Sequence, residues 1–104
     1  MDTQASGQFT SSDLGAITDD LRQLVVKAAN LGHIKPHEID ADLPLYRDGL
    51  GLDSIDILEL VVHVERRYGL KIRNDDEGRV ALRNIRSLAE HAQRHLQGAT
   101  KAEG

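Results

Sequence analysis

The stretch GLGLDSIDIL, residues 49–58, places one serine between two glycines and a row of aliphatic residues. Asp53 precedes Ser54 directly, and Asp56 follows it two residues later. Aspartate and serine are favoured N-cap residues, and carboxylates are stabilised at the positive end of a helix dipole. The stretch therefore predicts that a helix begins at Asp53 or Ser54.

The apolar residues of this predicted helix, which ends near Tyr68 with Gly69 as its stop signal, form two separate stripes. With a turn of about 100° per residue, one stripe is a wide arc that holds Ile57, Leu60, Val61, Val64 and Tyr68. An arc of that width is typical of a core-facing surface. The second stripe is narrower and bordered by charged residues, and it holds Ile55, Leu58 and Val62. Either another part of the chain covers the second stripe, or it is a docking surface for a partner.

An amphipathic helix is also predicted before this stretch, over residues 13–31. Its apolar residues recur at steps of three and four, at Leu14, Ile17, Leu21, Leu24, Val25, Ala28 and Leu31. Ser12 or Thr18 could cap its start, and Gly32 is placed to end it. The long connection over residues 33–52 contains four apolar residues that we expect to pack on the core, namely Ile39, Leu43, Leu45 and Tyr46.

The chain beyond the central helix is polar at first and then becomes amphipathic again. It allows at most a short helix, from about Glu77 to Leu82. A last helix begins near Asn84 or Ser87, where Ser87 and Glu90 could form a capping box. No segment alternates with a period of two, so the expected fold is an all-α bundle with one long loop.

The chain of 104 residues is long enough for one domain with a single modest core. We expect this domain at residues 13–97, between a flexible segment at 1–12 and a flexible tail at 98–104. A formal charge of −4 disfavours nucleic acid or an anionic membrane surface as a partner. Cysteine is absent, so the chain has no disulfide and no thiol of its own. With neither a signal-peptide pattern nor an apolar run long enough to span a membrane, a cytoplasmic location is expected.

Two roles of Ser54 are disfavoured by the sequence. A nucleophile is disfavoured because there is no G-x-S-x-G elbow, and because His63 lies nine residues along the same helix. A calcium loop ending at Glu59 fails because leucines occupy two of its ligand positions. The pairs Glu59/His63 and His91/His95 have four-residue spacing, but two ligands do not make a metal site. A helix cap and a site of covalent attachment remain.

The segment GLGLDSIDILELVVHVERRYGLKI, residues 49–72, resembles the modification motif and second helix of acyl carrier proteins. The family's Asp-Ser-Leu signature corresponds to Asp53-Ser54-Ile55, and the similarity extends over about residues 13–97. The resemblance implies a four-helix bundle of acyl-carrier type, with three longer helices and one short helix. It also implies that Ser54 carries 4′-phosphopantetheine, delivered from coenzyme A by a separate phosphopantetheinyl transferase.

The resemblance implies a non-catalytic carrier whose acyl cargo is held as a thioester on the thiol of that arm. Its further partners would be acyl-transferring and chain-elongating enzymes. Ile55, Leu58 and Val62 match the partner-contacting positions of the second helix, and Asp53, Asp56 and Glu59 match its acidic positions. We expect a monomer that binds no nucleic acid, inserts into no membrane and holds no metal.

Basic residues depart from the pattern of familiar fatty-acid carriers. They are His63, Arg66 and Arg67 on the central helix, and Arg73, Arg79, Arg83 and Arg86 further along. We hypothesise a specialised carrier that serves its own enzymes, in a polyketide-like, polyene or unusual fatty-acid pathway. A carrier of aminoacyl or other carboxylate cargo, and an unmodified helical interaction domain, stay open as alternatives.

Overall fold

The computed structural model describes residues 13–46, 49–73 and 75–103, and over residues 97–103 it describes the backbone alone. The elements in chain order are α1 (Leu14–Ala28), the 3₁₀ turn η1 (Pro36–Glu38), α2 (Ser54–Tyr68), α3 (Asp76–Ala81) and α4 (Ile85–Glu103). Within these ranges there is no strand, and only two isolated β-bridges occur. The expected all-α bundle of three longer helices and one short helix is confirmed.

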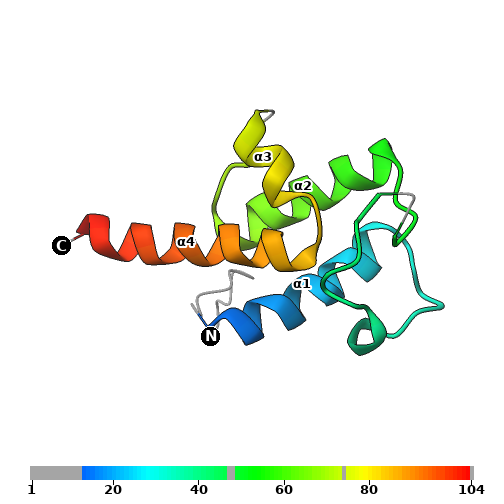
Figure 1. The fold of residues 1–104 in the computed structure, drawn as a ribbon. Coiled ribbons are helices and arrows are strands. Elements are labelled where there is room, and N and C mark those ends of the chain that lie inside the picture. Colours follow the sequence, from blue (N-terminus) through cyan, green and yellow to red (C-terminus); the bar gives the residue numbers. More distant parts are fainter. Residues whose placement is uncertain (1–12, 47–48, 74, 104) are drawn as a thin grey trace.

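Helix α1 is the centre of the packing, because it lies against both α2 and α4, while α3 packs on α4 (Figure 1). In Figure 1, α3 rises steeply from the start of α4. Helices α2 and α3 make little direct contact with each other. The core lies between the three long helices, and its fully buried large side chains are Ile17, Leu21, Val25, Leu45, Leu52, Leu60, Val64, Ile85 and Leu88.

The predicted ends of the first helix need correction. The N-cap is Asp13, whose Oδ2 accepts a hydrogen bond from the Ala16 N–H at 2.9 Å. Thr18 lies inside the helix, and Ser12 lies outside the described residues. The left-handed residue at the C-terminus is Asn30, with φ of 57°, because asparagine tolerates this conformation and closes the helix two residues before the predicted glycine.

Helix α4 begins after Asn84, one of the two predicted starts, with a reciprocal cap between Asn84 and Ser87. The Ser87 N–H donates to Asn84 Oδ1 at 2.7 Å, and the Asn84 N–H donates to Ser87 Oγ at 3.1 Å. The pair is therefore Asn84 with Ser87 and not Ser87 with Glu90, since asparagine is among the strongest N-caps. The backbone of α4 continues as helix to Glu103, beyond the predicted end of the domain at residue 97.

The long connection packs on the core only in part. Ile39 and Leu45 are buried as predicted, and Leu52 is buried as well, but Leu43 and Tyr46 are exposed, so the prediction is wrong for these two. The loop is tied to α4 through Arg86, whose backbone N–H donates to the Ala41 carbonyl at 3.0 Å. The Arg86 guanidinium also hydrogen-bonds the Asp42 carboxylate, which lowers the pKa of Asp42 below its ordinary value.

A buried carboxylate joins α1 to the C-terminal end of α2. Asp20 accepts hydrogen bonds from the Arg67 guanidinium, one of them at 2.8 Å, and from the Tyr68 hydroxyl. The hydrogen bond to Asp20 raises the pKa of Arg67, so the Arg67 guanidinium stays positively charged. Burial, reinforced by Asp20, raises the pKa of the Tyr68 phenol well above its ordinary value. Arg67 therefore serves the fold, although the sequence had marked it as a surface departure.

Candidate functional site

The loop that leads to Ser54 depends on its two glycines. The Leu50 N–H donates to the Pro44 carbonyl at 2.9 Å, so the chain passes very close to that oxygen. A Cβ on Gly49 would lie 2.0 Å from it, which no side chain could accept. Gly51 has φ of +85°, in the region that favours glycine. Buried Leu52 then anchors the loop immediately before α2.

The carboxylates on both sides of Ser54 cap the helix. Asp53 Oδ1 accepts from the Asp56 N–H at 2.9 Å, and Asp56 Oδ2 accepts from the Asp53 N–H at 3.1 Å. This capping box fixes Asp53 as the N-cap and Ser54 as the first residue of α2. It also gives both aspartates a structural reason to be next to the serine.

Ser54 is left without a structural task of this kind. Its side chain is exposed, and within the described ranges its hydroxyl forms no hydrogen bond. The free amides of the first turn and the helix dipole favour a negative charge at this end of α2. The hydroxyl is therefore available to accept a group, and an anionic linkage there would be stabilised.

The two apolar stripes of α2 separate as the periodicity predicted. Ile57, Leu60, Val64 and Tyr68 are buried, and Val61 is half-buried. The exposed fractions of Ile55, Leu58 and Val62 are 71%, 64% and 39%. Neither the long loop nor α3 covers the second stripe in the described part of the chain. Its flanking carboxylates, Asp56 and Glu59, are half-buried and exposed, respectively.

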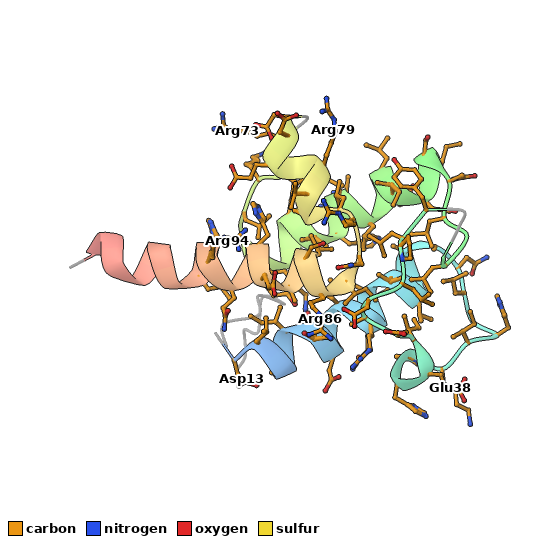
Figure 2. All side chains as sticks on the ribbon, viewed as in Figure 1. Asp13, Glu38, Arg73, Arg79, Arg86 and Arg94 are labelled. Atoms are coloured by element: carbon orange, nitrogen blue, oxygen red, sulfur yellow. The ribbon has the colours of Figure 1, made fainter. Side chains whose placement is uncertain are left out.

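A pocket of about 730 Å³ lies between α2 and α3, where these helices make little direct contact. Ser54 is one of its lining residues. The apolar part of the lining comes from both helices and their connection, and consists of Ile57, Leu58, Val61, Ile72 and Leu82, with Pro44 and Tyr46 from the loop. The basic part of the lining consists of Arg73, Arg79 and Arg83. The side chains of Arg73 and Arg79 lie at the outer end of α3, away from the N-terminal end of α2 (Figure 2).

The candidate metal ligands do not form a complete site within the described residues. No group of three or more ligating side chains that could hold a metal ion occurs among the residues with described positions. His91 and His95 line a small polar pocket together with Lys71, Arg73 and Arg94, and with the acidic residues Asp75 and Glu77. No described helix is long and apolar enough to cross a membrane.

Residues 19–92 match the family model described as "Phosphopantetheine attachment site". This match covers more than half of the chain, including α2, α3 and the pocket between them. The chain belongs to this phosphopantetheine-binding family. Its members are non-catalytic carriers, and a separate phosphopantetheinyl transferase modifies them.

Relatives of this carrier are named acyl carrier proteins. One from Streptomyces coelicolor is 33% identical over 82 residues, which are 79% of this chain and 84% of the relative. One from Brachyspira hyodysenteriae is 29% identical over 80 residues, 77% of this chain and 96% of the relative. The actinorhodin polyketide synthase acyl carrier protein of Streptomyces coelicolor is 38% identical over 64 residues, 61% of this chain and 72% of the relative. No solved structure matches the chain.

The residues around Ser54 fit a phosphopantetheine group. A phosphodiester needs a hydroxyl that is exposed and not engaged elsewhere, and Ser54 provides one at a helix N-terminus. An arm attached there would start at the edge of the apolar pocket. Sequence patterns missed this pocket, since its walls come from segments that only the fold brings together. The polar, glycine-interrupted segment between the last two long helices was the only signal that packing would be loose there.

Proposed function

We propose that Ser54 carries 4′-phosphopantetheine, and that this chain delivers acyl intermediates to the enzymes of a fatty-acid or polyketide pathway. The observation that carries this proposal is the exposed Ser54 hydroxyl, free of internal hydrogen bonds within the described ranges and set at the edge of an apolar pocket. A serine that capped the helix would be engaged with backbone amides, whereas Asp53 performs that role here.

Each residue of the site has a distinct task in this account. The Ser54 oxygen accepts the group from coenzyme A, under catalysis by the transferase. Asp53 and Asp56 hold the first turn of α2 in shape through their capping box, so the serine is presented in one orientation. When attached, the arm supplies a thiol, which this cysteine-free chain lacks and which holds the acyl group as a thioester. The α2–α3 pocket shelters the part of the acyl chain next to the arm.

The exposed stripe of α2 is the surface on which partner enzymes dock in this proposal. Large apolar side chains as exposed as Ile55 and Leu58 gain free energy when a partner covers them. Asp56 and Glu59 border them and favour a partner with a basic surface. Of the three basic residues in the C-terminal half of α2, only His63 and Arg66 can distinguish this face from that of familiar fatty-acid carriers, because Arg67 is paired with Asp20. A specialised pathway is the finer proposal that these two residues support.

The carrier domain in this proposal comprises residues 13–97, which enclose the family match at residues 19–92. Intact-mass measurement tests the attachment. The purified protein is weighed before and after incubation with coenzyme A and a broad-specificity phosphopantetheinyl transferase. We expect a gain of one phosphopantetheine unit, or the same unit already present at the start. Ser54→Ala should show neither.

Ser87→Ala is the matched control, because Ser87 is the other serine of the described ranges and its hydroxyl is engaged at the start of α4. It should be modified like the parent chain, provided that circular dichroism finds it folded. Modification of Ser54→Ala, or absence of any modification of the parent, would contradict the proposal.

A further inference from the structure

Among the residues that the structure describes, three arginines and no acidic residue line the α2–α3 pocket. Arg73 comes from the connection after α2, Arg79 from α3 and Arg83 from the segment before α4. All three are exposed. This basic lining is local, since the whole chain carries a formal charge of −4.

Two of these guanidinium groups have no carboxylate partner in the described part of the chain. Arg79 forms an ion pair with Asp76 at 2.8 Å on its own helix. No ion pair is formed by Arg73 or Arg83 within the same ranges. Nearby Asp75 is engaged as the N-cap of α3, where it accepts from the Gly78 N–H at 3.0 Å. The fold therefore places Arg73 and Arg83 at the pocket without an ion pair from the described residues to balance either charge.

The backbone holds these arginines in place. The Arg83 carbonyl accepts from the Leu45 N–H at 3.0 Å, which fixes this residue against the loop that leads to Ser54. Next to Arg73, the Ile72 N–H donates to the Glu65 carboxylate at 2.9 Å, and Gly78 packs so closely that a Cβ on it would lie 1.8 Å from the Arg73 carbonyl oxygen. Both guanidinium groups therefore extend from anchored backbone at the wall of one apolar pocket.

A plain hydrocarbon chain would use only the apolar part of this pocket. A chain that bears a carboxylate would use both parts, because guanidinium groups bind carboxylates through paired, charge-assisted hydrogen bonds. We propose that the preferred cargo is an acyl chain with a carboxylate remote from the thioester, held by Arg73 and Arg83. This inference rests on the attachment at Ser54 proposed above.

The test compares two cargoes of equal length on the same protein. The transferase loads the apo protein from octanoyl-coenzyme A, or from the coenzyme A thioester of octanedioic acid, whose far end is a carboxylate. Mass spectrometry then follows the spontaneous hydrolysis of each thioester in the parent and in the double variant Arg73→Gln/Arg83→Gln. The control is Arg66→Gln/Arg94→Gln, which removes the same charge at exposed arginines outside this pocket.

We expect the double variant at Arg73 and Arg83 to hydrolyse the carboxylate-ended thioester about two- to fivefold faster than the parent, the range for an exposed ion pair. Octanoyl hydrolysis should be unchanged, and the control pair should alter neither rate. The difference should vanish at about 1 M salt, where screening acts within about 3 Å. In ¹⁵N spectra, the carboxylate-ended chain alone should shift the Nε–H signals of Arg73 and Arg83.

The outcomes separate the two proposals. Failure of both coenzyme A thioesters to load would overturn the attachment at Ser54, and this inference with it. Successful loading followed by equal effects of the variant on both cargoes, or by equal effects of the control pair, would overturn the cargo inference alone.

Discussion

The two sides of α2 are held in different ways. On the side of α1, Leu60 and Val64 are fully buried, and Arg67 and Tyr68 bind the carboxylate of Asp20. On the side of α3, direct contact is sparse and a pocket of about 730 Å³ remains. The difference indicates that the side facing α1 holds the helix in place, while the side facing α3 leaves room for an acyl chain beside Ser54.

The largest effect on stability should come from a cavity on the packed side of α2, the side that faces α1. Leu60→Ala should lower the free energy of unfolding by about 2–4 kcal/mol, through lost burial and the cavity left behind. Leu58→Ala, the same substitution on the exposed stripe of the same helix, should cost less than about 1 kcal/mol. Urea unfolding followed by circular dichroism measures both. Equal losses would mean that the stripe is packed and would remove it as a docking surface.

Removing the buried carboxylate should have the next largest effect. Asp20→Asn weakens its hydrogen bonds to Arg67 and Tyr68, and should cost about 1–2 kcal/mol because Arg67 is partly solvated. The neighbouring Asp19→Asn breaks only an exposed pair with Arg22 and should change stability by less than about 0.5 kcal/mol. The same urea titration compares the two variants. An Asp20 variant as stable as the Asp19 variant would show that this link does not fix α2.

The raised pKa of the Tyr68 phenol leads us to expect a loss of stability at alkaline pH. Its pKa is raised in the folded chain, chiefly by burial and then by Asp20, so the folded state keeps this proton to higher pH than the unfolded chain. The stabilising contribution is complete below the ordinary pKa of about 10 and is lost as pH rises above it. Between about pH 9 and 11 we expect a loss of about 1 kcal/mol from this group.

Tyr68→Phe is the variant that isolates this contribution. Its stability should fall less steeply over the same pH range, because it has no phenol to ionise. Urea unfolding at several pH values gives both curves, and parallel curves for parent and variant would contradict the assignment.

The smallest effect on stability should come from the exposed stripe. Ile55→Ala should change the free energy of unfolding by less than about 0.5 kcal/mol, yet lower kcat/KM of the transferase for the apo protein by about three- to tenfold. Val80→Ala alters an exposed apolar side chain on α3, outside the stripe, and should leave kcat/KM unchanged. Steady-state kinetics that gave the same rate for both variants would place the docking surface elsewhere.

Local patterns predicted much of the fold and the core of the candidate site. The bounds of α2, its stop at Gly69 and the separation of its two stripes all follow from rules that act within one helix. The capping box at Asp53 and Asp56 is equally local. Competing caps were harder to judge, since Asp13, Asn30 and Asn84 each lie close to another residue able to do the same task.

Features that depend on contacts between distant parts of the chain could not be predicted from local sequence patterns. Asp20 and Arg67 are 47 positions apart, so nothing in the pattern of α2 alone marks Arg67 as an inward-facing ion. Exposure of Leu43 and Tyr46 likewise depends on how the loop lies on the core. The arginines were evident as departures from a family pattern, but their common pocket arises only when α3 packs on α4 and stands away from α2.

The most direct test of this difference between the two sides of α2 is a comparison of amide ¹H–¹⁵N spectra of the phosphopantetheine-loaded protein before and after octanoylation. A chain entering between α2 and α3 should shift the amides of Val61, Ile72 and Leu82 and leave those of Leu21 and Ala89, in the α1–α4 core, in place. Shifts concentrated in the α1–α4 core, or an unchanged pocket, would contradict it.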